Sequence, residues 1–242
     1  MTSVPRARRV VSLVPSLTEA VAETAPGLLA GATDWCTRPA GLDVVRVRGT
    51  KNPDLPAIVA LAPDLVIANE EENRAADLDA LRAAGLRVLV TEVRSLPQAF
   101  QELERVLVDG CGLARPDWLD AAESAWRDLA RRPAPGRRRA VVPIWRRPWM
   151  VLGRDTFAGD LLARLGVDQV YADHPERYPR VQLAELRPAD LVVLPDEPYR
   201  FTVDDGPEAF PGLPAALVSG RHLTWYGPSL TEAPAVLAAA LG

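Results

Sequence analysis

Carboxylates follow two short apolar runs that lie in opposite halves of the sequence. The run at residues 64–68 leads into NEEENR, and the run at residues 190–194 leads into PDEP. Carboxylates at the start of a helix cancel the positive end that would attract phosphate. These positions therefore favour amides, hydroxyls, amines or a cationic metal centre over nucleotides. The alternative is that the carboxylates only stabilise a helix start, by about 0.3–1 kcal/mol each.

Large aromatic residues lie at or near the ends of predicted strands, where small polar residues are usual. Four of the six tryptophans have such positions: Trp35, Trp145, Trp149 and Trp225. Tyr178, Tyr199, Phe201 and Tyr226 lie near them, with arginines interleaved. Exposed rings indicate stacking surfaces for a flat ligand, and guanidinium groups suit its polar edges. The alternative is that the rings only pack a contact between two lobes.

Sequence signatures of enzymes and metal sites are absent. The sequence has no glycine-rich phosphate loop, no GxGxxG and no nucleophile elbow. His174 and His222 lie in predicted loops without a partner at ligand spacing, and Cys36 and Cys111 have no metal-type spacing. We therefore expect no catalytic residue, no metal site and no intrinsic cofactor.

Strand-like and helix-like segments alternate through both halves of the sequence. The two apolar runs are typical of strands buried on both faces of a parallel sheet. The predicted fold is α/β, with two Rossmann-like lobes that have mainly parallel sheets. A long helix in DWLDAAESAWRDLARR, residues 117–132, joins them as a stiff strut. The predicted divisions are an N-terminal lobe at 1–113, the backbone helix and linker at 114–136, and a C-terminal lobe at 137–242.

Local signals predict several helix ends. Ser16-Leu17-Thr18-Glu19 and Ser229-Leu230-Thr231-Glu232 match the capping box that opens a helix. Gly85 follows a helical pattern and predicts a left-handed C-terminal cap.

Composition excludes some partners and bears on location. The 242 residues carry a formal net charge of −4, which gives no reason to expect nucleic acid or an anionic membrane surface as partner. The sequence has no apolar window long enough to span a membrane, so we expect no membrane insertion. No apolar segment follows the first basic residues, which predicts a cytoplasmic protein as written. A periplasmic or surface-anchored location is expected if a native leader has been trimmed.

Seven segments, in order, resemble one family. They are VVSLVPSLTE, GATDWC, GTKNPDLPAIVALAPDLVIANEEENR, PIWRRPWMVLGRDTFAGDLLARLG, ERYPRVQLAEL, LVVLPDEPYRF and TWYG. They are spread along nearly the whole chain, from residue 10 to residue 227, and together resemble class III periplasmic substrate-binding proteins. These are the cobalamin- and siderophore-binding components of ABC importers, also called helical-backbone metal receptors. The resemblance implies two α/β lobes bridged by one long helix, and a non-enzymatic receptor that holds a corrinoid or other metal chelate in an interlobe cleft.

The resemblance and the aromatic pattern together give a predicted ligand site. On the N-terminal lobe its residues are Trp35, Lys51, Glu71, Asn73 and Arg74. On the C-terminal lobe they are Trp145, Trp149, Tyr178, Glu197, Tyr199 and Trp225. The rings are expected to stack on the ligand, and the charged groups to select its orientation and polar edges.

The resemblance also implies a protein partner. Importers of this family dock on an ABC permease through one exposed glutamate on each lobe. Glu185 matches the position on the C-terminal lobe, whereas Pro56 stands at the N-terminal position. This departure keeps two alternatives open. One is a cytoplasmic ligand chaperone or sensor that is not coupled to transport. The other is an enzyme in which Cys36, Glu71 or His174 acts on the bound ligand.

Overall fold

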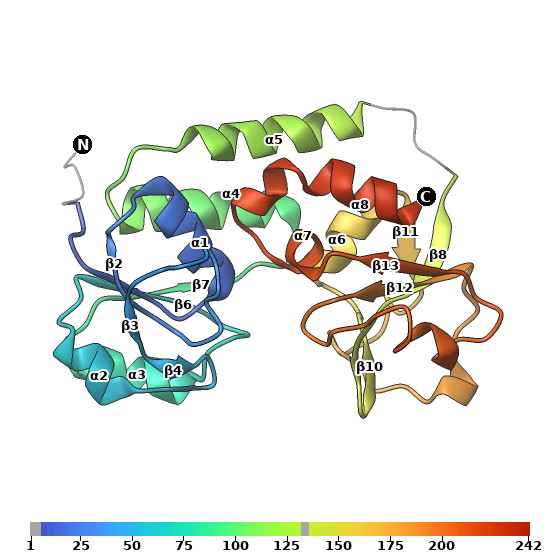
Figure 1. Cartoon of the computed structure of the whole chain (residues 1–242), viewed down its shortest axis with the longest axis horizontal. Helices are drawn as coiled ribbons and strands as arrows, with labels where there is room; N and C mark the ends of the chain where they lie inside the picture. The colour runs from blue at the N-terminus through green and yellow to red at the C-terminus, as the bar shows by residue number, and fades with distance from the viewer. Residues whose placement is uncertain (1–5, 132–135) are drawn as a thin grey trace. The chain divides into compact units, whose positions relative to one another are not determined.

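The computed structural model describes residues 6–131 and 136–242 (Figure 1). Residues 1–5 and residues 132–135 of the predicted helix and linker lie outside this part. The chain divides into two compact units. Unit 1 comprises residues 6–92, 100–120 and 226–228, and unit 2 comprises residues 93–99, 121–131, 136–225 and 229–242.

Unit 1 is built on a five-stranded sheet with the order β3-β2-β1-β6-β7. Its strands are β1 (Val10–Ser12), β2 (Leu29–Ala32), β3 (Val45–Arg46), β6 (Leu65–Asn69) and β7 (Val88–Thr91). All neighbouring strands are parallel. After β1 the chain adds β2 and β3 on one side of β1, and it then adds β6 and β7 on the other side. The strand order therefore reverses between β1 and β6, which is where open parallel sheets bind ligands.

Helices and one hairpin complete unit 1. The helices are α1 (Pro15–Thr24), α2 (Leu55–Ala60), α3 (Ala75–Ala83), α4 (Leu96–Glu104) and the π-helical turn Arg105–Gly110. The antiparallel hairpin consists of β4 (Arg48–Gly49) and β5 (Asn52–Pro53). The helix α5 (Asp117–Ala130) has 14 residues and a length of about 21 Å. Both α4 and α5 contribute residues to the two units.

Unit 2 repeats the arrangement with a four-stranded parallel sheet of order β11-β8-β12-β13. The strands are β8 (Arg138–Val141), β11 (Val167–Gln169), β12 (Leu191–Pro195) and β13 (Ala215–Val218). An antiparallel hairpin of β9 (Pro143–Arg146) and β10 (Trp149–Val151) follows β8. The helices are α6 (Phe157–Arg164), α7 (Gly220–Thr224) and α8 (Ala233–Leu241), with 3-10 turns at Leu183–Glu185, Pro207–Ala209 and Pro228–Thr231. Here the strand order reverses between β8 and β12.

The predicted fold class is confirmed: both units are α/β with parallel sheets. The predicted lobe ranges and the cleft between the lobes stay predictions. Within residues 6–131 and 136–242, no helix combines the length and the apolar character that a membrane span requires.

An aspartate just before β6 and one just before β12 have the same structural role. A side-chain oxygen of Asp64 accepts hydrogen bonds from the backbone N–H groups of Arg8 and Arg9, at 2.6 and 2.9 Å. Asp190 accepts one from the backbone N–H of Arg139 at 2.7 Å. Each aspartate fixes the start of the neighbouring strand, so the repeated Pro-x-Asp or Pro-Asp pattern has a structural cause.

Three expectations about helix starts are wrong. The N-cap of α1 is Val14 rather than Ser16, because Pro15 occupies the first turn and needs no partner for an N–H group. Residues 229–231 belong to a 3-10 turn, and α8 starts after Glu232 with Pro234 in its first turn. The three glutamates 70–72 do not open a helix, since α3 starts at Ala75. In contrast, Gly85 has a φ of +84° and ends α3 as predicted.

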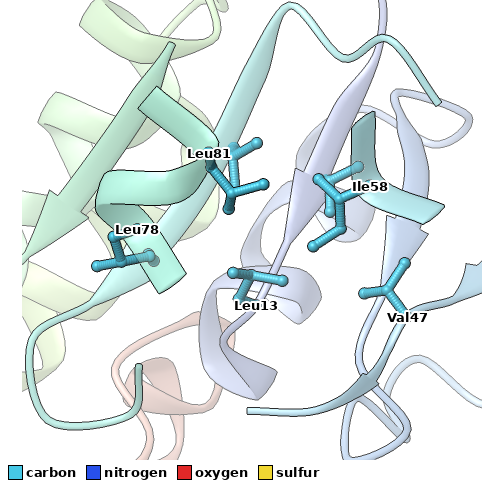
Figure 2. Packing of buried hydrophobic residues seen from close by; sticks show 8 residues of the cluster. Leu13, Val47, Ile58, Leu78 and Leu81 are labelled. Atoms are coloured by element: carbon cyan, nitrogen blue, oxygen red, sulfur yellow. The ribbon is translucent and has the colours of Figure 1, made fainter. Parts of the chain in front are cut away.

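The core of unit 1 packs α2 and α3 against the sheet (Figure 2). Leu13, Val47, Ile58, Leu78 and Leu81 are among its buried members. All five positions of β6 are buried, as expected for a strand covered on both faces.

Shortening Ile58 tests this core. Ile58→Ala leaves a cavity among fully buried neighbours, so we expect a loss of about 2–5 kcal/mol in the free energy of unfolding, measured by urea denaturation. The neighbouring Val59 is 41% exposed, and Val59→Ala should change the stability by less than about 0.5 kcal/mol. Equal losses for the two variants would contradict this packing.

Candidate functional site

The loop that leaves β6 is shaped by two asparagine side chains. The Asn69 amide oxygen accepts from the backbone N–H groups of Glu71 and Glu72, at 2.9 and 3.3 Å. The Asn73 amide oxygen accepts from the backbone N–H of Asn69 at 2.9 Å. Both asparagines are buried. The glutamates therefore lie in a side-chain-stabilised turn at the carboxyl edge of the sheet.

The β4–β5 hairpin is fastened to this loop. The Asn73 amide nitrogen donates to the Thr50 carbonyl at 3.0 Å, and the Lys51 ammonium donates to the Glu71 carbonyl. Lys51 is exposed at the tip of the hairpin, so its charge is brought to the edge of the sheet. Asn73, in contrast, is engaged on both sides, which gives it a positioning role whether or not it also contacts a ligand.

Burial and two neighbouring charged groups shift the pKa of Glu72. Burial raises the pKa of the Glu72 carboxyl, the Lys51 ammonium lowers it, and the neighbouring Glu71 raises it again. Tyr226 belongs to the same unit and is buried. Burial raises the pKa of its hydroxyl, which the nearby Thr91 and Ser16 side chains oppose. This part of unit 1 is thus a partly desolvated polar cluster with a single ammonium group.

The remaining predicted residues of unit 1 are more exposed. Trp35 follows β2 and is 66% exposed. Its indole nitrogen lies close to β4, because a Cβ on Gly49 would be 3.4 Å from it. Arg74 is exposed as the N-cap residue of α3. The structure therefore brings together Lys51, Glu71 and Asn73, and it places Trp35 beside the hairpin that carries Lys51.

Unit 2 presents aromatic rings at its own carboxyl edge. Trp149 stacks on Phe201 with ring centroids 6.0 Å apart, and it meets Phe210 edge-on at 5.2 Å. Trp145 contacts Tyr199 edge-on at 5.7 Å and is 42% exposed. Trp149 is therefore partly buried against the core of unit 2, while part of the Trp145 ring is exposed to solvent.

An ionic network supports these rings. The Arg146 guanidinium pairs with Asp205 and Glu208 and lies 5.4 Å from the centroid of the Trp149 ring. The Tyr199 hydroxyl donates to Asp205 at 2.6 Å, and this bond raises the pKa of Tyr199. The charge of Arg146 is thus compensated within the unit, and the network fixes the orientation of the aromatic rings.

A second contact joins the loop after β12 to the residue after α7. The Trp225 indole donates to a Glu197 carboxylate oxygen at 2.8 Å. A Cβ on Gly220 would lie 2.6 Å from the Glu197 backbone nitrogen, so only glycine allows this approach. Trp225 follows a helix rather than a strand, which the sequence reading missed. Tyr178 lies in the segment beside β10, with the Arg177 guanidinium 5.8 Å from its ring.

The predicted ligand residues as a set stay a prediction. The structure adds Glu72, Tyr226, Arg146 and Asp205 to the groups at the two edges. The NEEENR run pointed towards Glu72, and Arg146 is one of the arginines interleaved with the aromatic residues. Its partner Asp205 lies 59 positions away and gave no signal.

Two surface hollows of unit 1 lie away from these groups. One, of about 490 Å³, is lined by residues 6–8 and 25–28, and the other, of about 370 Å³, by Arg6, Thr24 and residues 112–117. They adjoin the amino-terminal ends of the strands and contain none of the predicted ligand residues. The candidate site is defined by the polar and aromatic groups at the carboxyl edges.

Of the groups named in the enzyme alternative, Cys36 lies in surroundings that disfavour the reactive thiolate. Cys36 is buried, with Thr18 and Thr33 hydroxyls 3.0 and 3.1 Å from its sulfur, and burial raises the pKa of its thiol. Cys111 is also buried, and burial raises its pKa to about 11. Among the described residues, no group of three or more His, Cys, Asp or Glu side chains is arranged to hold a metal ion.

Solved structures with the same architecture cover nearly the whole chain. The periplasmic vitamin B12-binding protein BtuF of Vibrio cholerae is 18% identical, with a TM-score of 0.78 over 97% of this chain and 96% of that one. A periplasmic heme-binding protein from Pseudomonas aeruginosa is 24% identical, with a TM-score of 0.75 over 97% and 92%. CeuE of Helicobacter pylori, in a Ni-His complex, is 11% identical, with a TM-score of 0.82 over 98% and 83%.

The chain has the fold of the class III substrate-binding proteins. No family model matches the sequence. The class III fold confirms the resemblance seen in the sequence. Solved proteins that share this fold include periplasmic binding proteins for vitamin B12 and heme.

Thiol reactivity tests whether the buried cysteines are unreactive in the native protein. Because burial raises both thiol pKa values, the reactive thiolate is scarce below the raised pKa, and we expect almost no reaction of the native protein with a disulfide reagent at about pH 8. Both thiols should react after unfolding in urea. Fast labelling of native Cys36 at this pH would contradict its inert role and revive the enzyme alternative.

Proposed function

We propose that this protein is a solute receptor for a corrinoid or similar metal chelate. The observation that carries the proposal is the exposure of large rings at the carboxyl edges of both sheets. Trp35 is 66% exposed and Trp145 is 42% exposed. Large rings left in water forgo the free energy of burial, about 25 cal/mol per Å², which a bound flat ligand would restore.

Solved structures with this fold support a chelate as ligand. They include binding proteins for vitamin B12 and heme, and CeuE in a Ni-His complex. A flat macrocycle suits the free ring surface of Trp145, and its polar rim suits the charged and amide groups beyond β6 and β12. These features favour a corrinoid or other metal chelate over a phosphate-bearing ligand, because Glu71 and Glu72 disfavour phosphate.

Direct titration tests the ligand class. Adding cobalamins to the purified protein should quench tryptophan fluorescence and change the visible absorbance of the corrinoid. Trp145→Ala should weaken binding about tenfold or more, since it removes a stacking surface. Val203→Ala is a matched control, because Val203 is 72% exposed in the same unit and lies outside the aromatic cluster. No spectral change with any corrinoid at micromolar protein would remove this ligand class.

We further propose an ABC permease as partner, with Glu185 as the docking carboxylate of unit 2. Glu185 is exposed on the 3-10 turn Leu183–Glu185. Pro56 is exposed at the start of α2, so the corresponding surface of unit 1 has no carboxylate at that position. An importer role requires a location outside the cytoplasmic membrane. A cytoplasmic location, the prediction from the sequence as written, would instead fit a chaperone or sensor.

Uptake measurements separate these roles. Deleting the gene should lower uptake of labelled corrinoid, and the wild-type gene should restore it. Glu185→Ala should restore it only in part while leaving corrinoid binding unchanged, because the change weakens docking alone. Glu176→Ala, on an exposed loop of the same unit, serves as the control and should restore uptake fully. Unaltered uptake in the deletion strain would exclude the importer role and favour the chaperone or sensor.

A further inference from the structure

The β9–β10 hairpin of unit 2 has two different faces. Across the hairpin, Trp149 is paired with Arg146, and Met150 is paired with Trp145. Residues directly opposite each other in an antiparallel pair have their side chains on the same face. Trp149 packs on buried rings of the unit 2 core, so the face that it shares with Arg146 is directed towards that core. Trp145 and Met150 therefore lie on the outer face of the hairpin.

A third segment extends this outer face. The backbone N–H of Val181 donates to the Trp149 carbonyl at 3.1 Å. Arg180 is paired antiparallel with Met150, so it lies on the same face as Met150 and Trp145. Trp145 is 42% exposed, and Arg180 is exposed as well. The three residues thus form one row that combines an open indole ring, a half-buried thioether and a guanidinium group.

The hairpin turn places a second guanidinium group near this row. Arg147 follows Arg146 between β9 and β10, and its carbonyl accepts a hydrogen bond from the Trp145 indole at 3.2 Å. Arg147 is exposed. Its charge reaches the Tyr199 hydroxyl, whose raised pKa it opposes, and the Tyr199 ring contacts Trp145. Arg147 therefore carries its charge beside the same pair of rings.

The three arginines of this region differ in how their charge is balanced. Arg146 pairs with Asp205 and Glu208. Those two carboxylates also accept hydrogen bonds from a tyrosine hydroxyl and a backbone N–H, so they are engaged within the network. Within residues 6–131 and 136–242, neither Arg147 nor Arg180 forms an ion pair or a side-chain hydrogen bond. Water can solvate both groups, but their positive charge is left uncompensated.

An open ring beside two uncompensated guanidinium groups suits one kind of ligand edge. The indole favours a flat ligand, because stacking buries apolar surface. The planar fork of a guanidinium group matches the two oxygens of a carboxylate. A ligand that covers the ring also removes water from such an ion pair, and the attraction grows as the effective dielectric constant falls. A neutral ester or amide gains less at this place, and an ammonium group is repelled.

We infer that Arg147 and Arg180 bind ionised carboxylates at the edge of the flat ligand that stacks on Trp145, and that unit 2 thereby prefers chelates with acidic edges over their neutral counterparts. This inference deepens the proposed receptor function and rests on it. Arg147 and Arg180 are the specificity-determining residues. Arg146 is a positioning residue, because its charge is already compensated by Asp205 and Glu208.

Two matched pairs of ligands test the inference. Heme, with its two propionates, is compared with its dimethyl ester, and cyanocobalamin is compared with the isomers in which one peripheral amide has been hydrolysed to the acid. Titrations at about pH 7.5 and low salt, followed by tryptophan fluorescence, should show the acid of at least one pair binding about tenfold more tightly. The pair that shows the preference identifies the ring system. Salt at about 1 M should reduce the preference, because it screens exposed ion pairs.

Charge-removing variants assign the preference to the two arginines. Arg147→Gln and Arg180→Gln should each lower the affinity for the acid about threefold or more and leave the affinity for the neutral ligand unchanged. The double variant should show neither the preference nor its salt dependence, while Arg147→Lys, which keeps the charge, should retain part of the preference.

Arg139→Gln is the matched control. Arg139 is also exposed in unit 2 and has no side-chain ion pair within the described ranges, but it lies at the amino-terminal end of β8, at the other edge of the sheet. The change in net charge is the same as in either single variant. Arg139→Gln should therefore keep the wild-type preference for the acid.

The outcomes separate the inference from the proposed function. Equal binding of acid and neutral ligand in both pairs, or a preference that persists in the double variant, would overturn the inference and leave the receptor standing. Equal losses of affinity for both members of a pair in the single variants would indicate a purely structural role of the arginines and overturn it as well. Failure of every corrinoid and of heme to bind would reject the proposed function, and the inference would fall with it.

Discussion

The constraint on which the structure depends is the complete burial of one strand in each sheet. All five positions of β6 and all five of β12 are buried. A strand covered on both faces has no room for charged side chains, so the charged groups appear only after its last residue. In a parallel sheet, all strands reach the same edge with their carboxyl ends. The interruption of the strand order, at β1/β6 and at β8/β12, then determines which loops at that edge diverge and leave space for a ligand.

The two units stabilise these exits by different interactions. In unit 1, the side-chain amides of Asn69 and Asn73 replace backbone partners and hold the turn by four hydrogen bonds. In unit 2, the stacked rings of Trp149 and Phe201 and the ion pairs of Arg146 fix the corresponding region. Amides leave a polar surface, whereas stacked rings leave an aromatic one. This difference in scaffolding leaves polar groups at the carboxyl edge of unit 1 and aromatic rings at that of unit 2, and the proposed chelate would use both kinds of surface.

The buried strands could be predicted because their signal is local. A continuous apolar run with Pro and Asp before it identifies β6 and β12 without knowledge of the rest of the chain. The helix starts failed where two local signals competed. At Pro15 and Pro234 the fixed φ of proline and its missing N–H determined the first turn, and the nearby serines did not cap. At Glu70–Glu72 the asparagines at both ends of the run closed a turn before a helix could start.

Groups that meet only through the fold could not be predicted. The ion pair of Arg146 and Asp205 and the bond of Tyr199 to Asp205 require the hairpin after β8 to meet the loop after β12. Tyr226 belongs to unit 1 although the residues on either side of 226–228 belong to unit 2. Its closeness to Ser16 and Thr91 follows from that crossing of the chain and not from any motif.

Rigid scaffolding also bears on the cost of binding. The side-chain amides of Asn69 and Asn73 order the turn that carries Glu71 and Glu72 before any ligand arrives. Since the turn is already ordered, the proposed ligand needs to fix little more than the exposed side chains at this edge, at about 0.5–1.5 kcal/mol each. A flexible loop at the same place would lose more conformational entropy on binding, so the ordered turn favours affinity.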